Sequence, residues 1–190
     1  TCIVRDQSET ASGGLPQRSE DRDPETGTLS RQALDRVEAR LLAGLRRTRD
    51  PLALVLLDID GFERLAARVD GETAADAVRS VVGGAQEHLR TSDPVVRYQT
   101  SRLLVLLPST DLWAARSTAE RLRAAQERRV LETDAALVKL TLSAGVTLVE
   151  PSEPSLDLAI ERATRALDTA HERGDNQVVV THPPRAARAG

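Results

Sequence analysis

The chain has 190 residues, a length that suits one domain with flanking segments. Hydrophobic residues make up 40% of it and aromatic residues only 2%, so its core must consist of Leu, Val, Ile and Ala. A formal net charge of −3 argues against a chain that binds nucleic acid or a membrane surface through its overall field. The single cysteine, Cys2, excludes an internal disulfide and a cysteine-based zinc site.

The chain opens with a polar stretch, residues 1–22, that is predicted to be a flexible linker. Apolar residues then recur at helical spacing over Ser30–Arg49. The continuous apolar run Leu52–Leu57 predicts a buried strand, and helical patterns follow over Phe62–Val69 and Thr73–Leu89. The first half of the chain is therefore expected to contain a helix, a strand and two further helices.

The second half begins with two short apolar runs at hairpin spacing, Pro94–Tyr98 and Leu103–Leu107. A helix, a strand, a helix and a strand are then predicted over Leu112–Arg129, Leu137–Val149, Leu156–Arg173 and Gln177–Thr181. Strands that alternate with helices and include one hairpin indicate an α/β fold with a mixed sheet. We expect one domain over residues 23–181 and a disordered tail over residues 182–190.

Several polar and aromatic residues allow more than one interpretation. Asp58 and Asp60 follow the first predicted strand and are weak candidates for a lone Mg²⁺, with solvated loop carboxylates as the favoured interpretation. His171 is expected to be an exposed helix residue rather than a ligand. Trp113 opens a predicted helix, where it either covers the hairpin as part of the core or marks a protein contact.

From about Asp23 to Val180, the order and spacing of six segments resemble the GGDEF (diguanylate cyclase) family. These segments are Asp23–Gly27, Leu54–Phe62, Val96–Pro108, Ala119–Arg123, Leu140–Val146 and Ala163–Asn176. The resemblance implies a nucleotidyl-cyclase-like fold, in which helices flank a central mixed sheet of about five strands. It also implies a cytoplasmic bacterial signalling protein.

In this family, a cyclase joins two GTP molecules and needs carboxylates to hold Mg²⁺ at the triphosphates. The family signature falls here on Gln99-Thr100-Ser101-Arg102-Leu103, without its glycines and carboxylates. Its guanine-binding positions fall on Ala66 and Ala75, and its phosphate-contacting positions on His171 and Asp175. We therefore expect a degenerate diguanylate cyclase that is not an enzyme, with no catalytic residues, no cofactor and no metal beyond the weak candidates.

The resemblance also implies a second site. Many cyclases of the family bind their product, cyclic di-GMP, at an RxxD motif five residues before the signature. Arg90 and Asp93 occupy that position here, and a further arginine of this inhibitory site falls on Arg121. Arginine forms bidentate hydrogen bonds with a guanine edge or a phosphate, and an aspartate accepts hydrogen bonds from the guanine N1 and N2 donors. The tetrapeptide also occurs at Arg18–Asp21, Arg47–Asp50 and Arg165–Asp168, so only its position carries the prediction.

Two functions remain open from the sequence. The first is a cyclic di-GMP receptor that regulates a partner protein or an N-terminal domain of the same chain. A homodimer, or a dimer bridged by the ligand, is expected with it. The second is a ligand-independent dimerisation or docking module that binds no nucleotide. Neither involves nucleic acid or a membrane.

Overall fold

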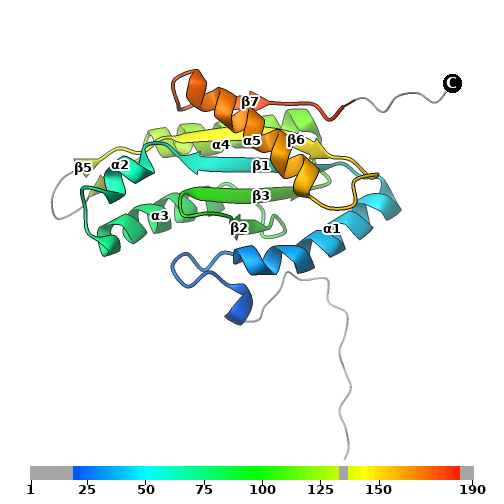
Figure 1. Ribbon diagram of the computed structural model, residues 1–190, viewed down its shortest axis with the longest axis horizontal. Helices are drawn as coiled ribbons and strands as arrows, with labels where there is room; N and C mark the ends of the chain where they lie inside the picture. The colour runs from blue at the N-terminus through cyan, green and yellow to red at the C-terminus, as the bar shows by residue number, and fades with distance from the viewer. Residues whose placement is uncertain (1–18, 133–136, 185–190) are drawn as a thin grey trace, which may run out of the picture.

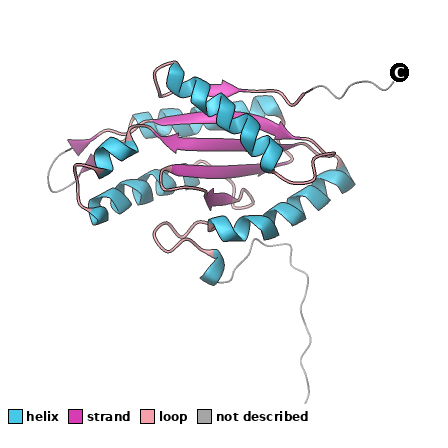
Figure 2. Ribbon diagram, in the orientation of Figure 1, coloured by secondary structure: helices cyan, strands magenta, loops and turns pink. Residues whose placement is uncertain are grey.

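A computed structural model describes residues 19–132 and 137–184 (Figures 1 and 2). The predictions of a linker over residues 1–18 and of a tail over residues 185–190 lie outside these ranges. Ser19–Asp21, which we expected in the linker, form a short 3-10 helix, and the buried Asp21 carboxylate contacts the Arg36 guanidinium. In the part of the chain that is described, no helix is long and apolar enough to cross a bilayer.

The central sheet has five strands in the order β2-β3-β1-β6-β7. These are β1 (Leu52–Ile59), β2 (Val95–Arg97), β3 (Arg102–Pro108), β6 (Leu142–Val149) and β7 (Val178–Val180). β1 pairs antiparallel with β3 and β6, β2 pairs antiparallel with β3, and β7 pairs parallel with β6. The sheet is therefore mixed and the predicted hairpin is present, which confirms the α/β fold with about five strands.

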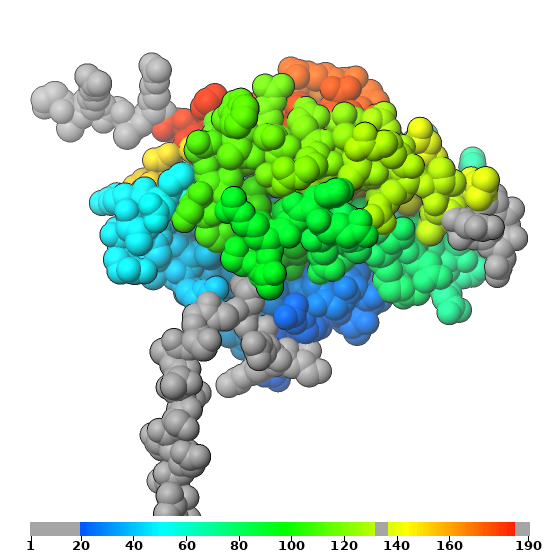
Figure 3. Space-filling model, turned by 180° about the vertical axis from the view of Figure 1, so that it is seen from behind, coloured from blue at the N-terminus to red at the C-terminus, as the bar shows by residue number. Residues whose placement is uncertain are grey.

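Helices cover both faces of this sheet. They are α1 (Leu34–Thr48), α2 (Phe62–Ala66), α3 (Gly71–Gln86), α4 (Leu112–Glu127) and α5 (Asp157–Glu172), with a 3-10 turn, Arg31–Ala33, before α1. Figure 1 shows α5 crossing the near face of the sheet, with α1 on the same side. Figure 3 shows α3 and α4, in green, over the opposite face. The result is a three-layer arrangement with the sheet in the middle.

Strand β1 is buried along its whole length because each sheet face packs against helices. Alternate residues point to opposite faces of a strand. Leu54 and Leu56 therefore join the core under α1 and α5, whereas Val55 and Leu57 join the core under α3 and α4. This packing explains why the sequence of β1 is continuously apolar rather than alternating.

One predicted strand is divided in the structure. The segment Leu137–Val149 is not one strand: β5 (Leu137–Val138) pairs with β4 (Leu131–Glu132) in a separate two-stranded sheet, and β6 starts at Leu142. Between them, the Leu140 carbonyl accepts a hydrogen bond from the Gln126 side chain rather than from a neighbouring strand.

The prediction that Trp113 belongs to the core is wrong, because 79% of this residue is exposed. α4 buries Ala115, Ala119 and Leu122, which share one helical face at spacings of four and three residues. Residue 113 lies two positions before Ala115, about 200° around the helix, and therefore points away from the sheet.

Gly145 in β6 is a point of close approach between the sheet and α5. A Cβ atom at this position would lie 1.9 Å from the Ala163 carbonyl oxygen and 2.8 Å from the Leu167 amide nitrogen. Both atoms belong to the α5 backbone, so no side-chain rotation can relieve the contact. The backbone of α5 therefore packs directly on the sheet at this residue.

We expect Gly145→Ala to destabilise the fold by about 1–3 kcal/mol or more, because it overpacks a backbone contact. Gly83→Ala is the matched control, since no atom lies within 4 Å of a Cβ at this position of α3. Alanine in a helix interior is favoured over glycine, so the control should be neutral or stabilising. Urea unfolding of both variants measures the difference, and equal stabilities would contradict the close approach.

A buried ion pair fixes the start of α5. The Arg162 guanidinium contacts the Glu153 carboxylate, and each side chain is 7% exposed. Arg162 also donates from Nε to Thr147 Oγ1 and from Nη2 to the Leu148 carbonyl. Glu153 Oε2 in turn accepts from the Glu150 amide. The pair therefore joins α5, β6 and the loop between them.

Removing one member of this pair leaves the other charge buried. We expect Arg162→Ala to lower the free energy of unfolding by about 3–5 kcal/mol. Arg165→Ala, which breaks the exposed pair with Glu161 on the same helix, should cost no more than about 0.5 kcal/mol. Chemical denaturation of the two variants is the measurement, and a similar loss in both would show that burial of the pair is unimportant.

Candidate functional site

The carboxyl end of β1 carries a cluster of charged side chains. Asp58 is the last acidic residue within the strand, and its register partner on β3 is Arg102. Arg102 Nε donates to Asp58 Oδ2 at 2.9 Å, and the two side chains are 26% and 11% exposed. A partly buried, hydrogen-bonded pair of this kind restrains both side chains beside the hairpin turn.

His171, near the end of α5, faces the same carboxylates. Its Nε2 lies 3.4 Å from Asp58 Oδ2, and its Nδ1 lies 3.8 Å from Asp60 Oδ1. The Nδ1 atom also makes a 2.7 Å hydrogen bond with Asp175 Oδ1, one helical turn further on. The imidazole therefore lies among three carboxylates contributed by β1 and by the segment that follows α5.

Burial lowers the pKa of the His171 imidazole, but its hydrogen bond with Asp175 raises it. The negative charges of Asp58, Asp175 and Asp60 add to the rise, and the net pKa lies above the usual value for histidine. The expectation that His171 is an exposed helix residue is therefore wrong, because its side chain is 31% exposed and faces the carboxylates.

Asp60 joins three segments of the chain at this site. Its Oδ2 accepts from Thr141 Oγ1 at 2.7 Å and from the Asn176 amide at 3.0 Å. Its own amide donates to the Thr141 carbonyl. Asp58 and Asp60 are 8% and 9% exposed, so the expectation of solvated loop carboxylates is wrong for both.

A pocket of about 290 Å³ opens beside this cluster. Asp58, Arg102 and His171 contribute to its wall, together with Gly61–Arg64 from the start of α2 and with Gln99 and Ser101 from the hairpin turn. The turn is closed by hydrogen bonds between Gln99 and Arg102. Gln99, Ser101 and Arg102, three of the five residues expected at the family signature, thus line the same pocket as Asp58.

The two alanines expected at guanine-binding positions lie on neighbouring helices. Ala66 is exposed at the end of α2, and Ala75 is partly buried in the first half of α3. Neither side chain can form a hydrogen bond.

The residues of the predicted cyclic di-GMP site lie at the turn between α3 and β2. Asp93 Oδ2 accepts from the Arg90 amide at 2.9 Å, and the Asp93 amide donates to the Arg90 carbonyl. Arg121, on α4, donates from Nη2 to the His88 carbonyl at 3.0 Å. The structure therefore brings Arg121 next to the turn that holds Arg90 and Asp93, and the Arg90 side chain is exposed.

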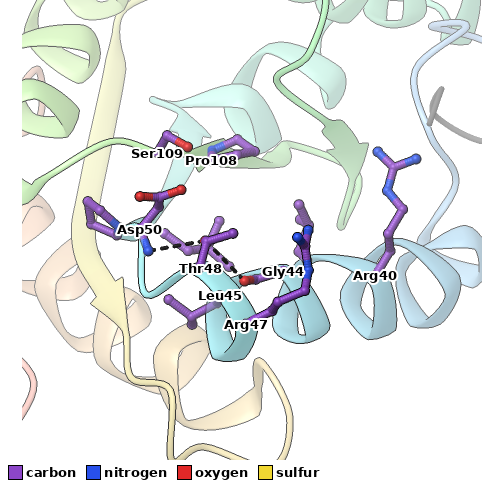
Figure 4. Close-up of a pocket in the computed structure, with 11 residues that line it drawn as sticks. Arg40, Gly44, Leu45, Arg47, Thr48, Asp50, Pro108 and Ser109 are labelled. Atoms are coloured by element: carbon purple, nitrogen blue, oxygen red, sulfur yellow. Dashed lines mark hydrogen bonds between the residues drawn. The ribbon is translucent and has the colours of Figure 1, made fainter.

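A second pocket, of about 200 Å³, lies between the end of α1 and the loops at Pro51 and Pro108 (Figure 4). Thr48 Oγ1 donates to the Gly44 carbonyl and accepts from the Asp50 amide, so these groups satisfy the end of the helix. None of the predicted site residues lines this pocket.

The raised pKa of His171 gives a testable pH dependence. The folded-state pKa lies above the unfolded value of about 6.5, so protonation of His171 stabilises the fold. This stabilisation is complete below the unfolded pKa and is lost as the pH rises through the folded pKa. We expect Asp175→Asn to lower the pKa of His171, as followed by NMR titration of the imidazole. The exposed His182 is the internal reference, and an unchanged pKa of His171 would contradict the contact.

Comparison with known proteins identifies relatives of this chain and of its fold. The family described as "Diguanylate cyclase, GGDEF domain" matches residues 20–177. The diguanylate cyclase DgcP of Pseudomonas aeruginosa is 35% identical over 159 residues, which are 83% of this chain and 23% of DgcP. The diguanylate cyclase DosC of Escherichia coli is 29% identical over 154 residues, 80% of this chain and 33% of DosC. The chain thus spans about a quarter to a third of these curated relatives.

Solved structures show the same fold. The GGDEF domain of DgcB from Caulobacter crescentus, solved in complex with c-di-GMP, superposes with a TM-score of 0.80 at 23% identity. That comparison covers 87% of this chain and 98% of the DgcB chain. The diguanylate cyclase SiaD of P. aeruginosa, solved with its activator SiaC, has a TM-score of 0.79 at 25% identity, over 84% of this chain and 61% of SiaD.

These comparisons contradict the prediction that the chain is not an enzyme. That prediction rested on residue types at Gln99–Leu103 and on the alanines, whereas the curated relatives are named diguanylate cyclases. Asp58 and Asp60, the weak Mg²⁺ candidates of the sequence analysis, are both buried at the end of β1. The family match covers most of the chain and four strands of the central sheet, and it ends at residue 177, directly before β7. The chain therefore belongs to the GGDEF family of diguanylate cyclase domains.

Proposed function

We propose that this GGDEF domain binds cyclic di-GMP at the turn between α3 and β2, through Arg90, Asp93 and Arg121. The observation that carries the proposal is the contact of Arg121 with the His88 carbonyl. It brings an arginine from another helix to a turn that already holds an arginine and a restrained aspartate. The three other RxxD tetrapeptides of the chain do not stand five residues before the family signature.

The chemistry of these side chains suits the ligand. Cyclic di-GMP carries two guanines and two phosphates, and each arginine can fork onto a phosphate or onto guanine O6 and N7. The Asp93 carboxylate accepts hydrogen bonds from guanine N1 and N2. Its contact with the Arg90 amide restrains the carboxylate before the ligand arrives, which reduces the entropy lost on binding.

Asp93 could also serve only to stabilise the turn, and an experiment has to separate this role from ligand binding. Asp93 is 9% exposed. Its carboxylate accepts a hydrogen bond from the Arg90 backbone amide and so stabilises the turn, with or without a ligand. Asp93→Asn keeps a side-chain oxygen that can accept from this amide, but it removes the negative charge that favours guanine donors. This substitution is therefore more informative than Asp93→Ala.

The structural neighbour DgcB was solved in complex with c-di-GMP, and the curated relatives are named diguanylate cyclases. These names support cyclic di-GMP as the ligand to test first. They also make conversion of GTP in the presence of Mg²⁺ an assay to run on the same preparation. Binding at Arg90 is a separate property from that reaction, so the two assays are independent.

Calorimetric titration of cyclic di-GMP into the full chain tests the proposal. We expect saturable binding that weakens at least about tenfold in Arg90→Ala and in Arg121→Ala, because each loses a charge-assisted hydrogen bond. Arg47→Ala is the matched control: it removes the arginine of another RxxD tetrapeptide, on α1, and should leave binding unchanged.

Sedimentation with and without the ligand then measures whether two copies assemble around it. If the folded wild-type chain gives no heat, or if Arg90→Ala binds as well as the wild type, the proposed site is wrong. In the first case, a docking module that needs no ligand becomes the better account.

A further inference from the structure

One carboxylate oxygen of the site has no hydrogen-bond partner in the described part of the chain. The Asp60 side chain is 5% exposed, and its Oδ1 atom is buried without a hydrogen bond among the described residues. Its other oxygen accepts two hydrogen bonds, from Thr141 and Asn176. A buried carboxylate oxygen without a partner is costly, and such groups in folded proteins usually meet a water molecule or an ion.

This oxygen points toward two other ligand-type atoms. His171 Nδ1 lies 3.8 Å from it, and Asp175 Oδ1 lies 2.7 Å from the same nitrogen. One ligand atom from each of the three residues lies within 4.8 Å of the other two. Ligands that share a tetrahedral zinc ion at ordinary bond lengths are about 3.4 Å apart. The three atoms are therefore close to the spacing of a common coordination shell.

The surrounding contacts restrain these ligands. His171 Nε2, the other ring nitrogen, lies 3.4 Å from Asp58 Oδ2, and Arg102 Nε donates to the same oxygen. A metal-ligating histidine commonly donates its second N–H to a carboxylate, which fixes the tautomer and the orientation of the ring. The Thr141 hydroxyl and the Asn176 amide similarly hold Asp60.

We propose that Asp60, His171 and Asp175 bind one divalent transition cation of the zinc class, with His171 coordinating through Nδ1. Asp58 is a positioning residue that acts through His171. An imidazole nitrogen with two carboxylates suits Zn²⁺ or Co²⁺ better than Mg²⁺, which prefers oxygen ligands alone. The His171 and Asp175 side chains are 31% and 38% exposed, so an ion can enter from solvent and keep water as its remaining ligand.

The proposal is independent of cyclic di-GMP binding, because it uses none of the residues at the turn between α3 and β2. It also differs from a lone Mg²⁺ on Asp58 and Asp60. The rival account needs no metal: a protonated His171 alone neutralises the carboxylates around it. The two accounts differ in what happens when the ion is added.

The test is titration of Co²⁺ into the full chain carrying Cys2→Ser, which removes a competing thiol. Visible absorption reports the coordination of Co²⁺, and calorimetry with Zn²⁺ reports the stoichiometry. We expect saturation at one ion per chain, with affinity at least tenfold weaker in His171→Ala. His182→Ala, in the same background, is the matched control and should bind as the parent does.

Asp58→Asn should weaken binding by about 10–100-fold, as expected for a residue that orients a histidine ligand. Thermal unfolding with added Zn²⁺ gives a second readout: the midpoint should rise for the parent and stay constant for His171→Ala. Absence of saturable binding in the folded parent would overturn the proposal. Equal binding by His171→Ala would overturn it as well, because the ion would then lie elsewhere.

Discussion

A single oxygen atom, Asp60 Oδ2, joins the segments on which the site depends. It receives the Thr141 hydroxyl from the segment before β6 and the Asn176 amide from the segment between α5 and β7. These segments are far apart in sequence and meet at Asp60, directly after β1. Without this acceptor, the segment that follows α5 would have one fewer restraint toward the sheet.

Acidic and basic side chains at this end of the sheet are paired with one another. Arg102 neutralises part of Asp58, whereas Asp60 and Asp175 remain opposite His171. The antiparallel register of β1 and β3 places Arg102 directly across from Asp58, so this pairing follows from the hairpin itself. Arg102 is thus held by an acidic residue of β1, and the wall of the pocket carries both signs of charge.

The periodicity of the sequence predicted the sheet and its helices because burial in three layers leaves a strong apolar pattern, as in Leu52–Leu57. Other features could not be read from that pattern. Trp113 was misplaced because a helix start gives few residues from which to determine the buried face. His171 was interpreted as an exposed helix residue, and both His171 and Asp175 were placed at phosphate-contacting positions of the family, although their spacing of four residues was a signal that they could act as a pair. Their meeting with Asp60 depends on tertiary packing that no local pattern encodes.

Gly145 has a consequence for how this domain can move. Since the α5 backbone lies directly on β6, the helix cannot slide or roll along the strand without lifting off the sheet. Helix and sheet must therefore move as one rigid body, and His171 moves with them. The short segment after the helix is fixed as well: Gly174, Asp175 and Asn176 have positive φ, and the Asn176 backbone amide donates to Asp60. The two ends of the cluster are therefore set by the sheet and by the helix that lies on it.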